Sequence, residues 1–280
     1  MADIKALSSA SASINDTALR RLLTKLALRT SARLYRRQGI CRRISPNKIV
    51  KSDPFVDLTE AATMQYIREN TTIPVPKVHC AFVSKGRAYI VMERLRGEFI
   101  ATVLMKMTEV EREALLAQLK TLLDHMRELL PASGTGVQSC IGGSLHDARI
   151  PKPDLRFGPF ETIQDFHCWL RDGLTIPQIK DENHGAEWAK MITKQDGPWP
   201  APVFTHGDLN PSNILVHKGK ISGIIDWEFS GWYPHYWEYT SSWYGNRLRT
   251  DWQNSLDKFL KPFPEELEME ITRQRWWGDF

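Results

Sequence analysis

The residues best suited to chemistry lie between His206 and Glu228. Asp208 lies in a tight turn, Asn213 follows five residues later, and two apolar strands joined by a short turn then lead to Asp226. Such a hairpin places Asn213 and Asp226 at one end, because both lie at strand termini on the same side of the turn. Two oxygen ligands suit Mg²⁺, which combines one or two protein oxygens with water and phosphate. Asp208, held apart from the metal, is suited to accept a proton from an attacking hydroxyl.

This order and spacing resemble the catalytic loop of kinases, H-x-D-x-x-x-x-N, which is followed one hairpin later by a metal-binding aspartate. With Gly207 after the histidine, and Asp-Trp-Glu where protein kinases have Asp-Phe-Gly, the stretch is similar to the aminoglycoside phosphotransferase and choline kinase family. The resemblance covers roughly residues 34–270 and implies an α+β, two-lobed protein-kinase-like fold. It also implies Asp208 as catalytic base, Asn213 and Asp226 as Mg²⁺ ligands, and ATP as phosphate donor. The alternative is a surface hairpin whose polar residues only form turns.

Length and composition fit that fold. The chain has 280 residues, of which 42% are hydrophobic and 25% charged, enough for two lobes with a sizeable core. We expect an N-terminal arm with a basic helix over 1–33, a β-rich nucleotide lobe over 34–97 with its hinge at 93–97, and a mostly helical lobe over 98–280. No apolar run reaches the roughly 18 residues of a membrane span. Four widely spaced cysteines favour reduced thiols, and we expect a cytoplasmic protein.

The N-terminal region is strongly basic. Residues 1–17 are rich in Ser and Ala and are expected to fray, whereas residues 20–51 contain eleven Lys or Arg and no acid. A basic segment can indicate nucleic acid, a membrane surface or a mitochondrial transit signal. However, an apolar stripe at helical spacing predicts an amphipathic helix that packs on the nucleotide lobe: Leu19, Leu22, Leu23 and Leu26. We therefore expect no nucleic-acid or membrane partner.

Strands are predicted at 40–44 and 48–50, and Lys51 ends the second. In the resembled family, a lysine at this point contacts the α- and β-phosphates of ATP, although Lys48 lies on the same strand face. The following helix offers two roles for Glu60. It completes a capping box with Asp57, or, as the resemblance implies, it pairs with Lys51.

The expected phosphate-binding loop departs from the usual kinase pattern. Gly39 is the only glycine before Gly86, so no glycine-rich loop is possible, and the turn that begins at Ser45 would take its place. Strands at 78–83 and 88–92 then lead to the hinge. By resemblance, the backbone from Glu93 to Leu95 meets the adenine edge and Met92 lies behind the ring.

The remaining sequence predicts a largely helical region. A capping box at Thr108 opens a long helix that ends before Pro131, with its expected core stripe at Leu115, Leu119, Leu122, Met126 and Leu129. Residues 131–160 carry five glycines and four prolines, and are expected to form an extended loop between the lobes, with a further helix over 162–171.

Aromatic residues dominate the sequence after Asp226, and carboxylates lie among them. Glu228, Trp232 and Glu238 are our candidates for the acceptor site, because aromatic rings and carboxylates together bind cationic amines. The alternative is that most of these rings are core. Similar aromatic stretches occur in fungal phosphotransferase-like proteins.

We therefore predict transfer of the γ-phosphate of Mg-ATP to a hydroxyl of a small molecule, such as an aminoglycoside, a choline-like amine or a secondary-metabolite alcohol. A non-catalytic nucleotide-binding protein is the alternative, motivated by the missing glycine-rich loop. A protein kinase is disfavoured, because no Ala-Pro-Glu segment follows Asp226.

Overall fold

A computed structural model describes residues 12–37 and 39–278, and these residues form two compact units. The first unit extends to Met126 and includes Pro211–Glu228; the second comprises Arg127–Asn210 and the described residues from Phe229 onward. The first unit thus contains the 211–228 hairpin and most of the long helix, which we had assigned to the helical lobe. Our domain boundary at residue 97 remains a prediction. Within the described ranges, no helix is both long enough and apolar enough to cross a membrane.

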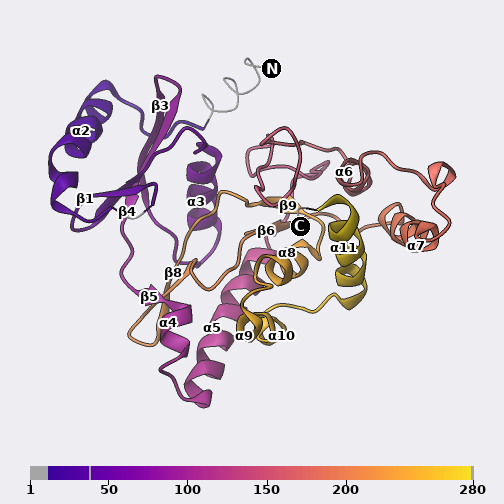
Figure 1. Ribbon diagram of the computed structural model, residues 1–280. Helices are drawn as coiled ribbons and strands as arrows, with labels where there is room; N and C mark the ends of the chain where they lie inside the picture. The colour runs from indigo at the N-terminus through magenta and orange to yellow at the C-terminus, as the bar shows by residue number, and fades with distance from the viewer. Residues whose placement is uncertain (1–11, 38, 279–280) are drawn as a thin grey trace. The chain divides into compact units, whose positions relative to one another are not determined.

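A four-stranded antiparallel sheet forms the centre of the first unit (Figure 1). Its order is β1-β2-β4-β3, and the strands match the predicted positions closely: β1 Cys41–Ser45, β2 Lys48–Lys51, β3 Val78–Ser84 and β4 Arg87–Glu93. Lys85 and Gly86 both have positive φ angles, 54° and 71°, so the β3–β4 loop has the backbone favoured in two-residue hairpins. Val50, Phe82 and Val91 form part of the apolar cluster on one face of the sheet.

Helix α3 (Thr59–Asn70) packs against β3, and its N-cap residue, Leu58, makes no side-chain capping hydrogen bond. The carboxylate of Asp57 accepts the backbone N–H of Thr59 at 2.8 Å. Glu60 is buried on the same helix as Met64 and Ile67, with 3% of its surface exposed. The capping box of Asp57 with Glu60 is therefore not formed, and the Glu60 carboxylate accepts from Lys51 instead.

The start of the chain and the first helix differ from the prediction. Residues 1–11 lie outside the described residues, but Ile14 is not frayed, since it pairs with Ala81 through two backbone hydrogen bonds of 2.8 and 3.0 Å. Helix α2 (Ala18–Arg29) is followed by the 3₁₀ turn η1 (Ser31–Leu34).

The expected packing face of α2 was wrong. Its four stripe leucines are 53–65% exposed: Leu19, Leu22, Leu23 and Leu26. The opposite face meets the sheet, where Thr24 is buried, Leu28 packs on the apolar cluster and Lys25 donates to Ser84 Oγ at 2.6 Å. Amphipathic spacing identifies a uniform face, but tertiary contacts decide which face finds a partner.

A second, three-stranded sheet completes the first unit. Its strands are β5 (Glu98–Phe99), β7 (Ile214–His217) and β8 (Lys220–Ile224), in the order β5-β7-β8. Lys218 and Gly219, with φ of 52° and 71°, form the two-residue turn of the β7–β8 hairpin.

Helices α4 (Ile100–Leu104) and α5 (Glu109–Arg127) follow β5. The core face of α5 is shifted from the prediction, because Leu116 and Leu123 are fully buried whereas Leu122 and Leu129 are only partly buried.

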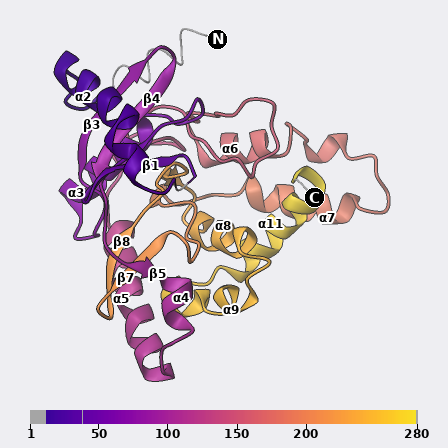
Figure 2. The same cartoon turned by 60° about the vertical axis from the view of Figure 1, so that its left-hand side comes forward.

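The second unit is mostly helical, and its short strands β6 (Val203–Thr205) and β9 (Gly231–Tyr233) pair with each other. Helix α8 contacts α10 and α11, and Figure 2 shows α8 and α11 side by side. The helical segments in chain order are α6 (Ile163–Leu170), η2 (Ile176–Gln178), α7 (Gly185–Gln195), α8 (Trp237–Gly245), α9 (Thr250–Gln253), α10 (Leu256–Phe259) and α11 (Pro264–Trp277).

The glycine- and proline-rich stretch 131–160 belongs to the second unit. Backbone bridges join Val137 to Phe160 and Leu145 to Phe157, and all but Phe160 are buried. The stretch forms no regular helix or strand, as its lack of hydrophobic periodicity predicted. These apolar anchors nevertheless fix the loop on its own unit, and the aromatic rings after it are mostly core.

His167 on α6 is a fully buried polar group of the second unit. Its ring nitrogens lie 3.0 Å from the carbonyl oxygen of Gln195 and 2.7 Å from the hydroxyl of Tyr236. Burial lowers the pKa of His167 from 6.5 to about 4. The ring is therefore neutral in the folded protein at pH 5, whereas in the unfolded chain it is protonated.

We predict that this ring makes the second unit sensitive to acid. A depressed folded pKa contributes stability above pH 6.5 that is lost as the pH falls toward 4, about 3 kcal/mol in total and about 2 kcal/mol of it by pH 5. Nine of the ten tryptophans lie in this unit, so denaturation followed by tryptophan fluorescence reports on it. The loss between pH 7 and 5 should be smaller by that amount in His167→Gln. Exposed His217→Gln is the control, and equal losses in His167→Gln and wild type would contradict the assignment.

Candidate active site

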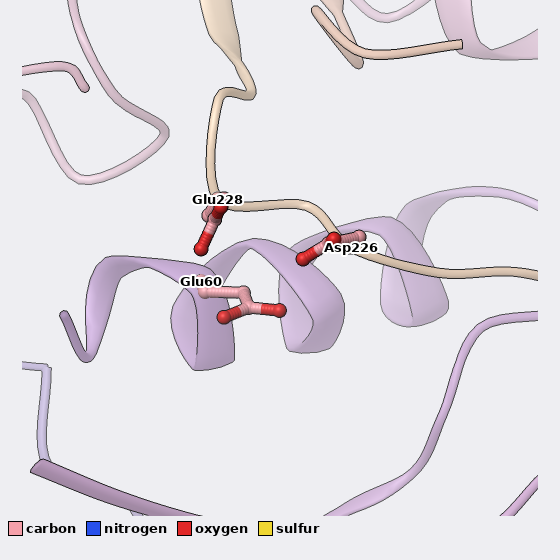
Figure 3. Close-up of side chains that lie close together, drawn as sticks. All are labelled: Glu60, Asp226 and Glu228. Carbon is pink, nitrogen blue, oxygen red and sulfur yellow. The ribbon is translucent and has the colours of Figure 1, made fainter. Parts of the chain in front are cut away.

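One lysine joins three carboxylates in the first unit. Lys51 Nζ, at the end of β2, lies 2.9 Å from Glu60, 2.6 Å from Asp226 and 3.1 Å from Glu228. Figure 3 shows the three carboxylates, Glu60 on α3 and the other two on the segment after β8. Their oxygen atoms lie within 4.8 Å of one another. The structure thus brings together four residues predicted from the sequence: Lys51, Glu60 and Asp226, and also Glu228, which we had expected at the acceptor site.

The charges of this cluster do not cancel. Lys51 is 5% exposed at its side chain and supplies one positive charge against three carboxylates. Burial opposes the charged ammonium, but the three carboxylates outweigh it and raise the pKa of Lys51. Burial, with the charges of Asp226 and Glu228, raises the pKa of Glu60 to about 7. The cluster therefore carries up to two uncompensated negative charges, and its hard oxygen donors suit a divalent cation such as Mg²⁺.

The β7–β8 hairpin positions Asp226 and Asn213. The N–H of Ile225 donates to the carbonyl oxygen of Asn213 at 2.9 Å, so the two strand ends lie side by side as the spacing predicted. Asp226 has φ of +68°, a left-handed conformation that is uncommon outside glycine but is several-fold enriched in Asp and Asn. Asn213 is 6% exposed, whereas the Asp226 side chain is 40% exposed. Whether the pair binds metal remains a prediction.

A cavity of about 550 Å³ in the first unit includes the cluster in its wall. Its lining also contains predicted hinge residues, namely Met92, Glu93 and Leu95. Leu95 lies against Gly223 of β8, where a Cβ would come within 2.3 Å of Leu95 Cδ1. A larger residue at 223 would therefore require the Leu95 side chain to move. The volume is within the range of small-molecule sites.

Three residues of the first unit that we considered for the nucleotide or metal site do not line this cavity: Ser45, Lys48 and Asn213. Ser45 is at the end of β1, where its hydroxyl bonds to Asn47 Oδ1 at 3.0 Å, and it does not line the cavity. A phosphate contact from Ser45 therefore remains a prediction. Lys48 pairs in register with Glu93 on β4 and likewise does not line the cavity. Of the two candidate lysines, Lys51 is the one placed in the wall.

The loop after β6 holds Asp208 in the second unit. Gly207 has φ of +83°, and a Cβ there would lie 2.7 Å from the carbonyl oxygen of Phe229, so a larger residue would not fit. The N–H of Asp208 donates to His206 Nδ1 at 3.1 Å, and Asn210 donates to Asp208 Oδ2 at 2.9 Å. The Asp208 side chain is 23% exposed. His206 therefore shapes the turn, and Asp208 keeps access to solvent.

Arg149 supports this loop, and sequence analysis did not select it. Its guanidinium lies 3.6 Å from Asp208 Oδ1 and donates to the carbonyl oxygen of Gly207. Asp147 binds the guanidinium in turn at 2.8 and 2.7 Å. Asp147 and Arg149 are the only charged residues between Glu128 and Lys152, which was the one available signal in this stretch.

The three acceptor-site candidates have other partners. Glu238 is 1% exposed, and its carboxylate accepts the N–H groups of His206 at 2.6 Å and Gly207 at 3.0 Å. Burial raises the pKa of Glu238. Trp232 is 5% exposed within β9, and Glu228 belongs to the first unit, where it bonds to Lys51. These three side chains do not form the expected open box, because Glu238 accepts the backbone N–H groups of the loop after β6 instead.

Comparison with known proteins gives two curated relatives. Clavilactone A biosynthesis cluster protein Y of Ampulloclitocybe clavipes is 26% identical over 204 residues, which cover 63% of this chain and 50% of that protein. Probable acyl-CoA dehydrogenase IBR3 of Arabidopsis thaliana is 26% identical over 208 residues, 68% of this chain and 23% of that protein. The chain thus spans half or less of the length of these relatives.

Solved structures confirm the fold. A thermostable mutant of aminoglycoside phosphotransferase APH(4)-Ia, in ternary complex with ADP and hygromycin B, matches with a TM-score of 0.56 at 14% identity, covering 85% of this chain and 82% of that one. The streptomycin-ATP-APH(2")-IIa ternary complex matches with a TM-score of 0.55 at 14% identity, covering 94% and 89%. The chain therefore has the α+β, protein-kinase-like fold predicted from its sequence.

A family model described as the phosphotransferase enzyme family matches residues 24–265. The match includes both compact units, the Lys51 cluster and the loop that carries Asp208. On this evidence, the chain belongs to the phosphotransferase enzyme family.

Proposed function

We propose that this protein transfers the γ-phosphate of Mg-ATP to a hydroxyl group of a small molecule. The observation that carries the proposal is the net negative Lys51 cluster in the wall of a 550 Å³ cavity beside the hinge. Phosphoryl transfer depends mainly on positioning and on neutralising phosphate charge, and the cluster offers a buried ammonium together with metal-binding carboxylates.

The cavity would receive the nucleotide with its base at the hinge. The backbone N–H groups of Glu93 and Arg94 each donate a hydrogen bond to a backbone carbonyl oxygen. That of Leu95 has no acceptor among the described residues. Leu95 therefore offers a donor to the adenine edge, and Met92 offers an apolar surface to the ring. Lys51 would contact the phosphates while Glu60 holds its ammonium in place.

Asp226 and Asn213, with Glu228 alongside, would hold Mg²⁺. The metal ion supplies neutralisation of the charge on the phosphate oxygens. The left-handed backbone at Asp226 directs its carboxylate into the cluster, where Lys51 already fixes one oxygen.

Asp208 would accept the proton of the acceptor hydroxyl as the oxygen attacks phosphorus. His206, Asn210 and the carboxylate of Glu238 fix the loop around Asp208 through the contacts described above. Residues 208 and 213 are five positions apart in the chain, so one loop connects the proposed base to a proposed metal ligand.

Asp208→Asn should lower turnover by roughly 10²- to 10⁴-fold, because a positioned general base is lost while the size of the side chain is kept. Mg-ATP affinity, measured by calorimetry, should stay within twofold of wild type. Asp154→Asn, an exposed aspartate of the same unit, is the matched control. A variant at Asp208 that keeps more than half of wild-type turnover would refute its role as base.

Asp226→Asn tests the metal site without changing the backbone, since asparagine tolerates the left-handed conformation at φ +68°. The change removes one negative charge and a metal ligand, so Mg-ATP affinity should fall by at least roughly tenfold. Asn213→Ala should instead raise the Mg²⁺ concentration needed for binding. Asp124→Asn on α5 is the surface control. Unchanged Mg-ATP binding in Asp226→Asn would eliminate the site.

A further inference from the structure

A second cavity, of about 510 Å³, lies within the second unit. It is lined by the segment around Arg149, by α8 with the turn that follows, and by α11. The lining contains four arginines, Arg149, Arg247, Arg249 and Arg273, against two carboxylates, Asp147 and Glu270. The cavity wall therefore has a positive balance, unlike the Lys51 cluster.

Both carboxylates of the wall are already neutralised. Asp147 binds Arg149 at 2.7 Å, and Glu270 binds Arg273 at 2.7 Å. Across the described ranges, neither Arg247 nor Arg249 has a carboxylate within the 4.0 Å of an ion pair, and both are exposed. The two arginines of this turn thus contribute positive charge that no protein carboxylate balances.

Two buried donors in the same wall also lack acceptors. Arg273 is 1% exposed, and its Nη1 atom has no hydrogen-bond partner among the described residues. Trp237 is 3% exposed, and its Nε1 atom also has no hydrogen-bond partner among the described residues. Buried donors are normally hydrogen-bonded, and a charged one is especially costly to leave unpaired. The unpaired Nη1 atom of Arg273 adds to the positive balance of this wall.

The cavity adjoins the proposed catalytic base. Arg149 lines it and also lies 3.6 Å from Asp208 Oδ1. A small molecule in the cavity is therefore separated from Asp208 by no more than one side chain. By contrast, Glu238 and Trp232, which we expected to hold a cationic acceptor, do not line this cavity.

We propose that this cavity holds the phosphate acceptor by an anionic group, a carboxylate or a phosphate, and that its arginines select for that charge. The inference rests on the proposed function and specifies its substrate class. The acceptor hydroxyl oxygen forms a bond to the γ-phosphorus of ATP as the bond from phosphorus to the β–γ bridging oxygen breaks. The hydroxyl proton passes to Asp208, and ADP leaves.

The variant that tests the cavity is Arg247→Gln combined with Arg249→Gln. Both side chains are exposed, so their loss leaves no buried carboxylate unpaired, whereas replacing Arg273 would strand Glu270. Lys180→Gln combined with Lys261→Gln is the matched control, because it removes two positive charges from exposed positions of the same unit outside the cavity.

The first measurement is anion binding. Protein saturated with Mg-ADP, so that the nucleotide site is filled, is titrated by calorimetry with inorganic phosphate and, separately, with butyrate. We expect saturable binding of at least one anion, weakened at least tenfold in the arginine variant and unchanged in the control. The anion that binds more tightly identifies the group. No saturable binding, or equal binding in the arginine variant, would overturn the inference.

The second measurement is phosphate transfer to matched acceptors. Hydroxy acids are compared with their methyl esters, and alcohols bearing a phosphate monoester with the parent diols. The anionic member of a pair should have at least tenfold higher kcat/KM, and the arginine variant should lose that ratio. A preference for neutral members would overturn the inference and leave the proposed function intact. Arginine-dependent anion binding without transfer to any member would support the site and count against the proposed function.

Discussion

The contact on which the first unit depends is the ammonium of Lys51 among three carboxylates. It joins the end of β2, the start of α3 and the segment after β8, which lie up to 177 residues apart in the chain. Removing one partner of a buried ion pair typically costs about 3–5 kcal/mol, because the remaining charge is left unpaired. Even with Glu60 protonated, one ammonium faces the two carboxylates of Asp226 and Glu228, so the arrangement joins the three segments and keeps a net negative charge.

In the second unit, hydrogen bonds to the loop backbone position Asp208. Glu238, which is 1% exposed, accepts two consecutive backbone N–H groups of the loop after β6, at His206 and Gly207. Those hydrogen bonds, with the close approach of Gly207 to Phe229, fix the turn from which Asp208 projects. Arg149 then links the loop to the arginine-lined cavity. The Lys51 cluster is net negative and the second cavity has a positive balance, which is why we propose a metal-bound nucleotide for the first and an anionic acceptor for the second.

Local patterns made much of this predictable. The strands of the first sheet and the β7–β8 hairpin follow from apolar runs separated by turns, and Asn213 and Asp226 share an end because a two-residue turn allows little else. Features that depend on tertiary contacts could not be predicted from local sequence patterns. Periodicity found the leucine stripe of α2 but not that Thr24 and Leu28 would face the sheet. Composition placed Glu238 among aromatics, yet nothing local showed that the backbone of a loop 32 residues earlier would take its carboxylate.

The central claim is that the excess negative charge around Lys51 makes nucleotide binding depend on a divalent cation. It is tested most directly by titrating the wild-type protein with ATP in a calorimeter, once with Mg²⁺ and once with EDTA. The account predicts that ATP affinity is at least tenfold weaker in EDTA, because a triphosphate then meets a cluster of its own sign. Equal affinities under the two conditions would contradict it.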